Sequence, residues 1–155
     1  MPGYSSIESP AGPRVRRCQL HGVLVQAFGC GVLITGESGV GKTECAIELL
    51  RRGHKFVADD AVQIFQSGVD VFGAAPEITR SLIAVRGIGI ANVTDVFHRA
   101  TLLRECRIDI NVEISGANEL SPIPKLGLTL FRLVAASPVV LADRIESIAR
   151  EDAGY

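Results

Sequence analysis

The feature that most constrains this chain is an uninterrupted stretch of eight residues, GESGVGKT, at positions 36–43. It fits the pattern G-x-x-x-x-G-K-[ST], in which glycines let successive backbone N–H groups turn inward around phosphate oxygens. The flanks also suit this pattern, because residues 32–35 read as a short buried strand and residues 43–52 as a helix that ends at Gly53. A strand, a glycine-rich loop and a helix in this order predict a nucleotide-phosphate site.

Every residue of the stretch is a candidate for nucleotide binding: Gly36, Glu37, Ser38, Gly39, Val40, Gly41, Lys42 and Thr43. The side chain of Lys42 is expected to reach the β- and γ-phosphates, and the hydroxyl of Thr43 to ligate Mg²⁺. The N-terminus of the following helix adds a partial positive charge at the same place.

Two adjacent acids, Asp59 and Asp60, follow the apolar residues 56–58. An acid directly after a buried strand is typical of the carboxylate that supports the metal beside such a loop. One of the two is expected to hold Mg²⁺, and the other to accept the proton of an attacking hydroxyl. Paired acids also separate their pKa values, which leaves one of them better suited as a base.

The segments before the loop favour an α/β protein with a mixed sheet over a purely parallel one. Residues 23–28 and 32–35 are predicted strands, joined by a tight turn at residues 29–31. A tight turn makes the two strands antiparallel neighbours, whereas a parallel pair would need a longer crossover.

Later segments extend this pattern with a strand, a hairpin, a long alternating strand, a loop, a further strand and a closing helix. Their predicted bounds are residues 55–58, 62–65 with 69–72, 107–114, 115–127, 128–134 and 141–150. The segment 107–114 alternates polar and apolar side chains without a break, which is typical of one half-buried strand.

Composition limits what a chain of 155 residues can be, since this length allows one domain with a real core. The formal net charge of -1 argues against a strongly basic nucleic-acid-binding protein, and no apolar run is long enough to span a bilayer. The four cysteines form no CxxC pair, so they are interpreted as reduced thiols of a cytoplasmic protein. Residues 1–17 are predicted to be a flexible lead-in to a catalytic domain at residues 18–155.

Four blocks of the sequence resemble HPr kinase/phosphorylase, a family of bacterial enzymes that phosphorylate a serine of HPr, the phosphocarrier of the sugar phosphotransferase system. The blocks are residues 21–25 (HGVLV), 31–44 (GVLITGESGVGKTE), 48–61 (ELLRRGHKFVADDA) and 85–93 (VRGIGIANV, matched at VRGIGI and NV). They occur in the family's order and together are far more specific than the phosphate loop alone.

The resemblance implies a P-loop kinase domain of the phosphoenolpyruvate carboxykinase-like type, with ATP and Mg²⁺ as cofactors and HPr as the partner. Asp59 would be the catalytic base, acting as an acid in the reverse phosphorolysis, and Asp60 would support the metal. His21 would lie near the phosphates, and Arg86 would bind phosphate or organise the site. The family assembles as hexamers, so a homo-oligomer is expected.

Two positions depart from the family's pattern. Ala84 stands two residues before Arg86, where the family has Glu, and residues 135–138 stand where it has Gly-Arg-Asn. Two other functions therefore stay open: a regulator that binds nucleotide without phosphotransfer, and a P-loop kinase acting on a small molecule or another peptide. The intact residues 36–43 and the two adjacent acids favour catalysis.

Overall fold

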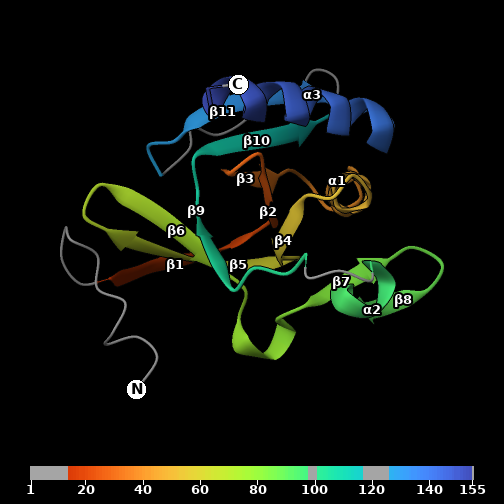
Figure 1. The fold of residues 1–155 in the computed structure, drawn as a ribbon, viewed down its shortest axis with the longest axis horizontal. Helices are drawn as coiled ribbons and strands as arrows, with labels where there is room; N and C mark the ends of the chain where they lie inside the picture. Colours follow the sequence, from red (N-terminus) through yellow and green to blue (C-terminus); the bar gives the residue numbers. More distant parts are fainter. Residues whose placement is uncertain (1–13, 98–100, 117–125, 155) are drawn as a thin grey trace.

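Two β-sheets pack against each other in the computed structural model of the chain, which describes residues 14–97, 101–116 and 126–154 (Figure 1). The larger sheet has the order β11-β10-β3-β2-β4 and is mixed, since β10 is parallel to β3 and β11 while β2 is antiparallel to β3 and β4. Its strands are β2 (Val23–Ala27), β3 (Cys30–Thr35), β4 (Lys55–Ala58), β10 (Ile110–Ser115) and β11 (Thr129–Val134). The predicted mixed sheet is confirmed.

The smaller sheet is antiparallel and has the order β1-β5-β6-β9. Its strands are β1 (Val15–His21), β5 (Ala61–Ser67), β6 (Asp70–Ala74) and β9 (Glu105–Arg107). The predicted hairpin is confirmed as β5 and β6, which pair directly across a short turn.

The two faces of the larger sheet pack into different cores. Helices α1 (Lys42–Arg51) and α3 (Pro138–Asp152) cover one face (Figure 1), where Ile34 packs in the same cluster as Leu49 and Ile145. The other face, which includes Leu33, packs against the smaller sheet. Consecutive residues of β3 thus enter opposite cores, as the two-residue period of a strand requires.

A small third unit follows β6. It consists of a short turn of 3-10 helix, η1 (Glu77–Thr79), the hairpin of β7 (Leu82–Val85) with β8 (Gly89–Asn92), and α2 (Val93–Phe97). Its β7, β8 and α2 lie on the side of α1 away from α3 (Figure 1), with Ile83 and Val93 buried in the core under the helices. No helix or strand was predicted from the sequence of this region. Its strands have four residues each, and a run as short as the apolar residues 82–85 does not separate strand from helix by periodicity.

The prediction of one strand over residues 107–114 is wrong, because the chain changes sheets at Ile108–Asp109 between β9 and β10. The Asp109 carboxylate accepts a hydrogen bond from Gly31 N at 2.8 Å, and Asp109 N donates to the Gly31 carbonyl at 2.8 Å. Ile108 N donates to the Val71 carbonyl of β6 at 2.7 Å. Each half keeps its own alternation, so the periodicity of the sequence does not reveal the crossing.

The predicted lead-in also needs correction. Residues 1–13 lie outside the described residues, but β1 begins at Val15, so the last three residues of the lead-in belong to the smaller sheet. Arg14 forms an ion pair with Glu105, and its guanidinium carbon lies 4.5 Å from the ring centroid of Phe72. These contacts fasten the start of β1 to β9 and β6.

The C-terminal helix begins earlier than predicted, at Pro138 instead of residue 141. The Ser137 hydroxyl accepts a hydrogen bond from Val140 N at 3.3 Å, and Pro138 takes the first helical position, which needs no N–H donor. This cap was readable from the sequence as Ser-Pro. The predicted loop 115–127 lies mostly outside the described residues.

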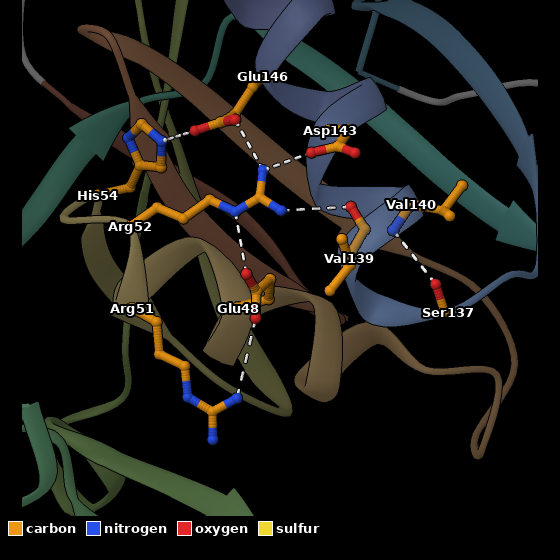
Figure 2. Close-up of polar contacts among 9 residues, drawn as sticks. All are labelled: Glu48, Arg51, Arg52, His54, Ser137, Val139, Val140, Asp143 and Glu146. Carbon is orange, nitrogen blue, oxygen red and sulfur yellow. Dashed lines mark hydrogen bonds and ion pairs between the residues drawn. The ribbon is translucent and has the colours of Figure 1, made fainter.

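A polar network joins α1 to α3 (Figure 2). The Arg52 guanidinium lies 2.8 Å from both Glu146 and Asp143 of α3 and 3.0 Å from Glu48 of α1. His54 Nε2 lies 2.6 Å from the second Glu146 oxygen. Burial alone would raise the pKa of Glu146, but the hydrogen bonds from His54 and Arg52 outweigh it and hold that pKa below 4.5. The network ties the helix that follows the phosphate loop to the C-terminal helix.

We expect Glu146→Gln to lower the free energy of unfolding at neutral pH by about 1 to 2 kcal/mol, between the values for exposed and buried ion pairs. A lowered pKa in the folded state means that the stabilisation is present above pH 4.5 and is lost as the pH falls through the folded-state pKa. Urea unfolding at pH 7 and pH 3 checks this, with Glu151→Gln on the exposed surface of α3 as the matched control. An equal loss at both pH values would contradict the ionic role.

No helix within the described part of the chain is long and apolar enough to cross a membrane. All four cysteines are free thiols, which agrees with their interpretation as reduced residues.

Candidate active site

The chain passes from one sheet to the other at two places that lie together beside the end of β3. The chain passes from β1 to β2 at Gly22 and from β4 to β5 at Asp59–Asp60, and Gly22 N donates to the Asp60 carbonyl at 3.2 Å. Gly22 is required there, because a Cβ atom would lie 2.7 Å from the Ile34 carbonyl oxygen. The topology therefore brings the end of β1 and the two acids to the loop that follows β3.

Residues 36–43 connect β3 to α1, as the sequence predicted. Gly36, Gly39 and Gly41 have φ values of 146°, 83° and 111°, which side-chain-bearing residues rarely adopt. Gly41 is the N-cap of α1 and offers no side-chain oxygen to the first N–H groups of the helix. Such N–H groups, together with the helix dipole, form an anion-binding site.

The Lys42 side chain is folded over its own loop. Its residue is 6% exposed, and Nζ donates to the carbonyl oxygens of Gly36 at 2.7 Å and Glu37 at 2.9 Å. Burial lowers the pKa of Lys42, while the nearby Asp59 carboxylate acts in the opposite direction. The two carbonyl oxygens hold the Lys42 ammonium group beside the loop that is expected to bind phosphate.

Asp59 is the acid in contact with the loop. One carboxylate oxygen accepts a hydrogen bond from the Thr43 hydroxyl at 2.9 Å, and the other accepts one from Ala84 N at 3.0 Å. The residue is 8% exposed, and this burial raises the pKa of Asp59 although both hydrogen bonds oppose the rise. A carboxylate with a raised pKa is a better proton acceptor than an ordinary one.

Asp60 lies at the rim, where its Oδ1 atom is 3.1 Å from His21 Nδ1. Both side chains are accessible to solvent, at 79% for Asp60 and 51% for His21. Arg86 lies in the turn between β7 and β8, is 77% exposed, and has Glu44 of α1 as a neighbour at 3.5 Å. These groups are accessible to a ligand from the solvent, in contrast to the buried Asp59.

A cavity of about 510 Å³ joins these groups, which is in the usual range for a small-molecule site. The predicted site residues that line it are His21, Ser38, Gly39, Gly41, Lys42, Thr43, Asp59, Asp60 and Arg86. Gly36, Glu37 and Val40 shape the loop but are not part of the lining.

Other lining residues were not predicted. Glu44 directly follows Thr43 and faces Arg86, so its place in the first turn of α1 was a readable signal. Ala84 contributes a backbone N–H to Asp59, and no sequence pattern marks such a contact. Leu82 and Ile90 of the third unit form an apolar wall that only the tertiary structure brings to the cavity.

Three oxygen donors that line the cavity fit a divalent cation of the magnesium type. Thr43 supplies a hydroxyl and Asp59 and Asp60 supply carboxylates, so all three offer the hard oxygen ligands that Mg²⁺ prefers. The hydrogen bonds that the buried Asp59 carboxylate accepts from Thr43 and Ala84 come from neutral groups, so a bound cation would compensate its charge.

A mixed sheet with helices on one face, a glycine-rich phosphate loop and an acid hydrogen-bonded to the last residue of that loop match the predicted fold class, a P-loop kinase domain of the phosphoenolpyruvate carboxykinase-like type. The model of the HPr serine kinase C-terminal domain matches residues 15–133, and the chain belongs to this family. It is also similar to the Hpr(Ser) kinase/phosphatase from Coxiella burnetii. That likeness has a TM-score of 0.74 and 24% identity and covers 87% of this chain and 95% of the other, and it concerns the fold. The resemblance inferred from the sequence is confirmed.

Proposed function

We propose that the protein is an ATP- and Mg²⁺-dependent serine kinase that transfers the γ-phosphate of ATP to a serine of HPr or of an HPr-like protein. The observation that carries this proposal is the contact between Thr43 and Asp59 at 2.9 Å in a cavity of about 510 Å³. A buried carboxylate in contact with the last residue of the loop supports the role of Asp59 as the base, and membership of the HPr serine kinase family supports the choice of acceptor.

In this proposal the backbone N–H groups of the loop and Lys42 bind the phosphates. The serine oxygen forms a bond to the γ-phosphorus, and Asp59 takes up the proton of the serine hydroxyl. At the same time the bond from that phosphorus to the β,γ-bridging oxygen breaks. ADP leaves with the electron pair. Bound Mg²⁺, held by Thr43 and Asp60, would neutralise phosphate charge. His21 and Arg86 line the same cavity and would donate hydrogen bonds to phosphate oxygens.

The reverse reaction uses the same groups. With inorganic phosphate as the attacking species, one of its oxygens bonds to the phosphorus of phosphoserine, the bond from that phosphorus to the serine oxygen breaks, and pyrophosphate is formed. Protonated Asp59 donates its proton to the released serine oxygen. We expect this phosphorolysis to depend on the same residues as the kinase reaction.

We also retain the expectation of a homo-oligomer, which light scattering of the purified chain measures directly.

The decisive experiment follows the label from γ-labelled Mg²⁺-ATP into purified HPr, with Lys42→Ala as the control. Removal of the ammonium group should weaken ATP binding by about tenfold or more, since a charge-assisted contact to phosphate is among the stronger hydrogen bonds. Calorimetry of ATP binding to both proteins gives this ratio. Label on HPr that disappears in the variant would support the proposal.

Two other outcomes would change it. If ATP binds but no label reaches HPr, the protein is a nucleotide-binding regulator or a kinase with another acceptor, and labelling of other peptides and small molecules separates these two. Unchanged ATP affinity in Lys42→Ala would show that Lys42 and its loop do not bind the phosphates, and would contradict the proposal.

A further inference from the structure

Asn111 is a buried side-chain amide in an otherwise apolar part of β10. The residue is 9% exposed, and its neighbours Ile110 and Val112 belong to the core under the helices. Burying an amide is costly unless its polar atoms find partners. The Asn111 Nδ2 group donates to the Leu33 carbonyl at 2.9 Å and to the Thr35 hydroxyl at 3.0 Å. Both partners lie at the end of β3, directly before the phosphate loop.

A second contact holds the same junction from β10. Gly36, the first residue of the loop, packs so tightly on this strand that a Cβ atom would lie 2.3 Å from the Ile114 carbonyl oxygen. The side chain of Asn111 therefore holds the Thr35 hydroxyl in place, and the backbone of Ile114 leaves no room for a side chain at Gly36. The junction is held at two consecutive residues by one neighbouring strand.

The junction leads directly to the group that binds phosphate, because the Gly36 carbonyl accepts a hydrogen bond from Lys42 Nζ at 2.7 Å. We infer that Asn111 is a positioning residue, which holds Thr35 and Gly36 in the orientation that the loop needs to bind the nucleotide triphosphate. It does not line the cavity itself. The inference rests on the proposed phosphate-binding role of the loop.

The test is a double-mutant cycle on ATP affinity, measured by calorimetry with Mg²⁺-ATP. We expect Asn111→Val and Thr35→Val each to weaken binding by about tenfold, the equivalent of one hydrogen bond. Because either substitution removes the contact between Asn111 and Thr35, the double variant should lose about as much as Asn111→Val alone, about tenfold, instead of the roughly hundredfold of independent changes. Thr35→Ser keeps the hydroxyl and should bind ATP like the wild type.

Ile145→Val is the control for a merely structural effect. It removes a methylene group from the buried face of α3 and lowers stability without touching the junction. Urea unfolding is measured for every variant, and the control should keep its ATP affinity within about twofold of the wild type. A control that loses as much affinity as Asn111→Val would assign the effect to stability and overturn the inference.

Wild-type affinity in Asn111→Val, or losses that multiply in the double variant, would also overturn the positioning role. If Asn111→Val does not fold, Thr35→Val decides by itself, and wild-type affinity there counts against the inference. Lys42→Ala distinguishes a failure of this inference from a failure of the proposed function. If Lys42→Ala weakens ATP binding while Asn111→Val does not, the loop binds phosphate but Asn111 does not position it.

Discussion

Asp59→Asn should reduce phosphotransfer by about a hundredfold or more while ATP binding stays within a few-fold of the wild type, because removal of a general base acts on the chemical step. Asparagine retains the shape of the side chain and one acceptor oxygen, but it cannot take up the proton of the attacking serine. The measurements are transfer of labelled phosphate to HPr and calorimetry of ATP binding on the same preparation.

The neighbouring acid supplies the matched control. Asp60→Asn removes the same charge one residue away, at a side chain that is 79% exposed and lies 3.1 Å from His21. We expect it to raise the Mg²⁺ concentration needed for half-maximal transfer, with activity recovered at high Mg²⁺. If Asp60→Asn instead abolished transfer at every Mg²⁺ concentration and Asp59→Asn did not, the base would be Asp60.

The Asp59→Asn variant also has a predicted effect on stability. Burial raises the pKa of Asp59 above 3.8, so its protonated form favours the fold. That contribution is complete below pH 3.8 and disappears as the pH rises through the folded-state pKa. The substituted asparagine is uncharged at every pH. The free energy of unfolding of Asp59→Asn, relative to that of the wild type, should therefore be higher at neutral pH than at acid pH. Urea unfolding at both values measures this difference.

Gly31→Ala should prevent stable folding, with a loss of about 4 kcal/mol or more, a large part of the stability of an ordinary domain. An alanine Cβ would lie 1.8 Å from the Arg107 carbonyl oxygen and 2.9 Å from its carbonyl carbon. This backbone cannot move aside easily, because Gly31 and Asp109 exchange two hydrogen bonds of 2.8 Å at the crossing between the sheets. The yield of folded protein and urea unfolding check the prediction.

Gly29→Ala is the control for this substitution. Gly29 has a φ of 77° but no atom within 4 Å of a Cβ position, so the change costs only backbone strain of about 1 kcal/mol. A cooperative unfolding transition for Gly31→Ala with the same midpoint as Gly29→Ala would show that the crossing tolerates a side chain, against our prediction.

Local features were predictable because they are encoded by neighbouring residues. The glycine spacing of residues 36–43, the apolar run of β3 and the helical face of α1 lie within one continuous segment, and each requires only the conformation of that segment. The chemistry of Lys42 and Thr43 follows from the same spacing. The placing of Asp59 and Asp60 after β4 was predictable for the same reason.

Other predictions failed or were never made because they depend on contacts between distant segments. The alternation of residues 107–114 was real, but the bonds of Asp109 to Gly31 and of Ile108 to Val71 divide it between two sheets. The strands β7 and β8 have only four residues each, too few for the periodicity of the sequence to identify a hairpin. Ser137 shows the opposite case, a helix cap that the sequence contains and that the helical periodicity alone does not reveal.

The sequence by itself therefore determined the phosphate loop, its flanking elements and the types of side chain available for catalysis, since those depend on backbone preferences over a few residues. Only the tertiary structure decided which acid meets Thr43, which one meets His21, and that Ala84 supplies a backbone N–H to Asp59. These contacts form where two sheet crossings meet. The position of such a corner is set by the packing of the whole core, to which every strand contributes and which no single segment specifies.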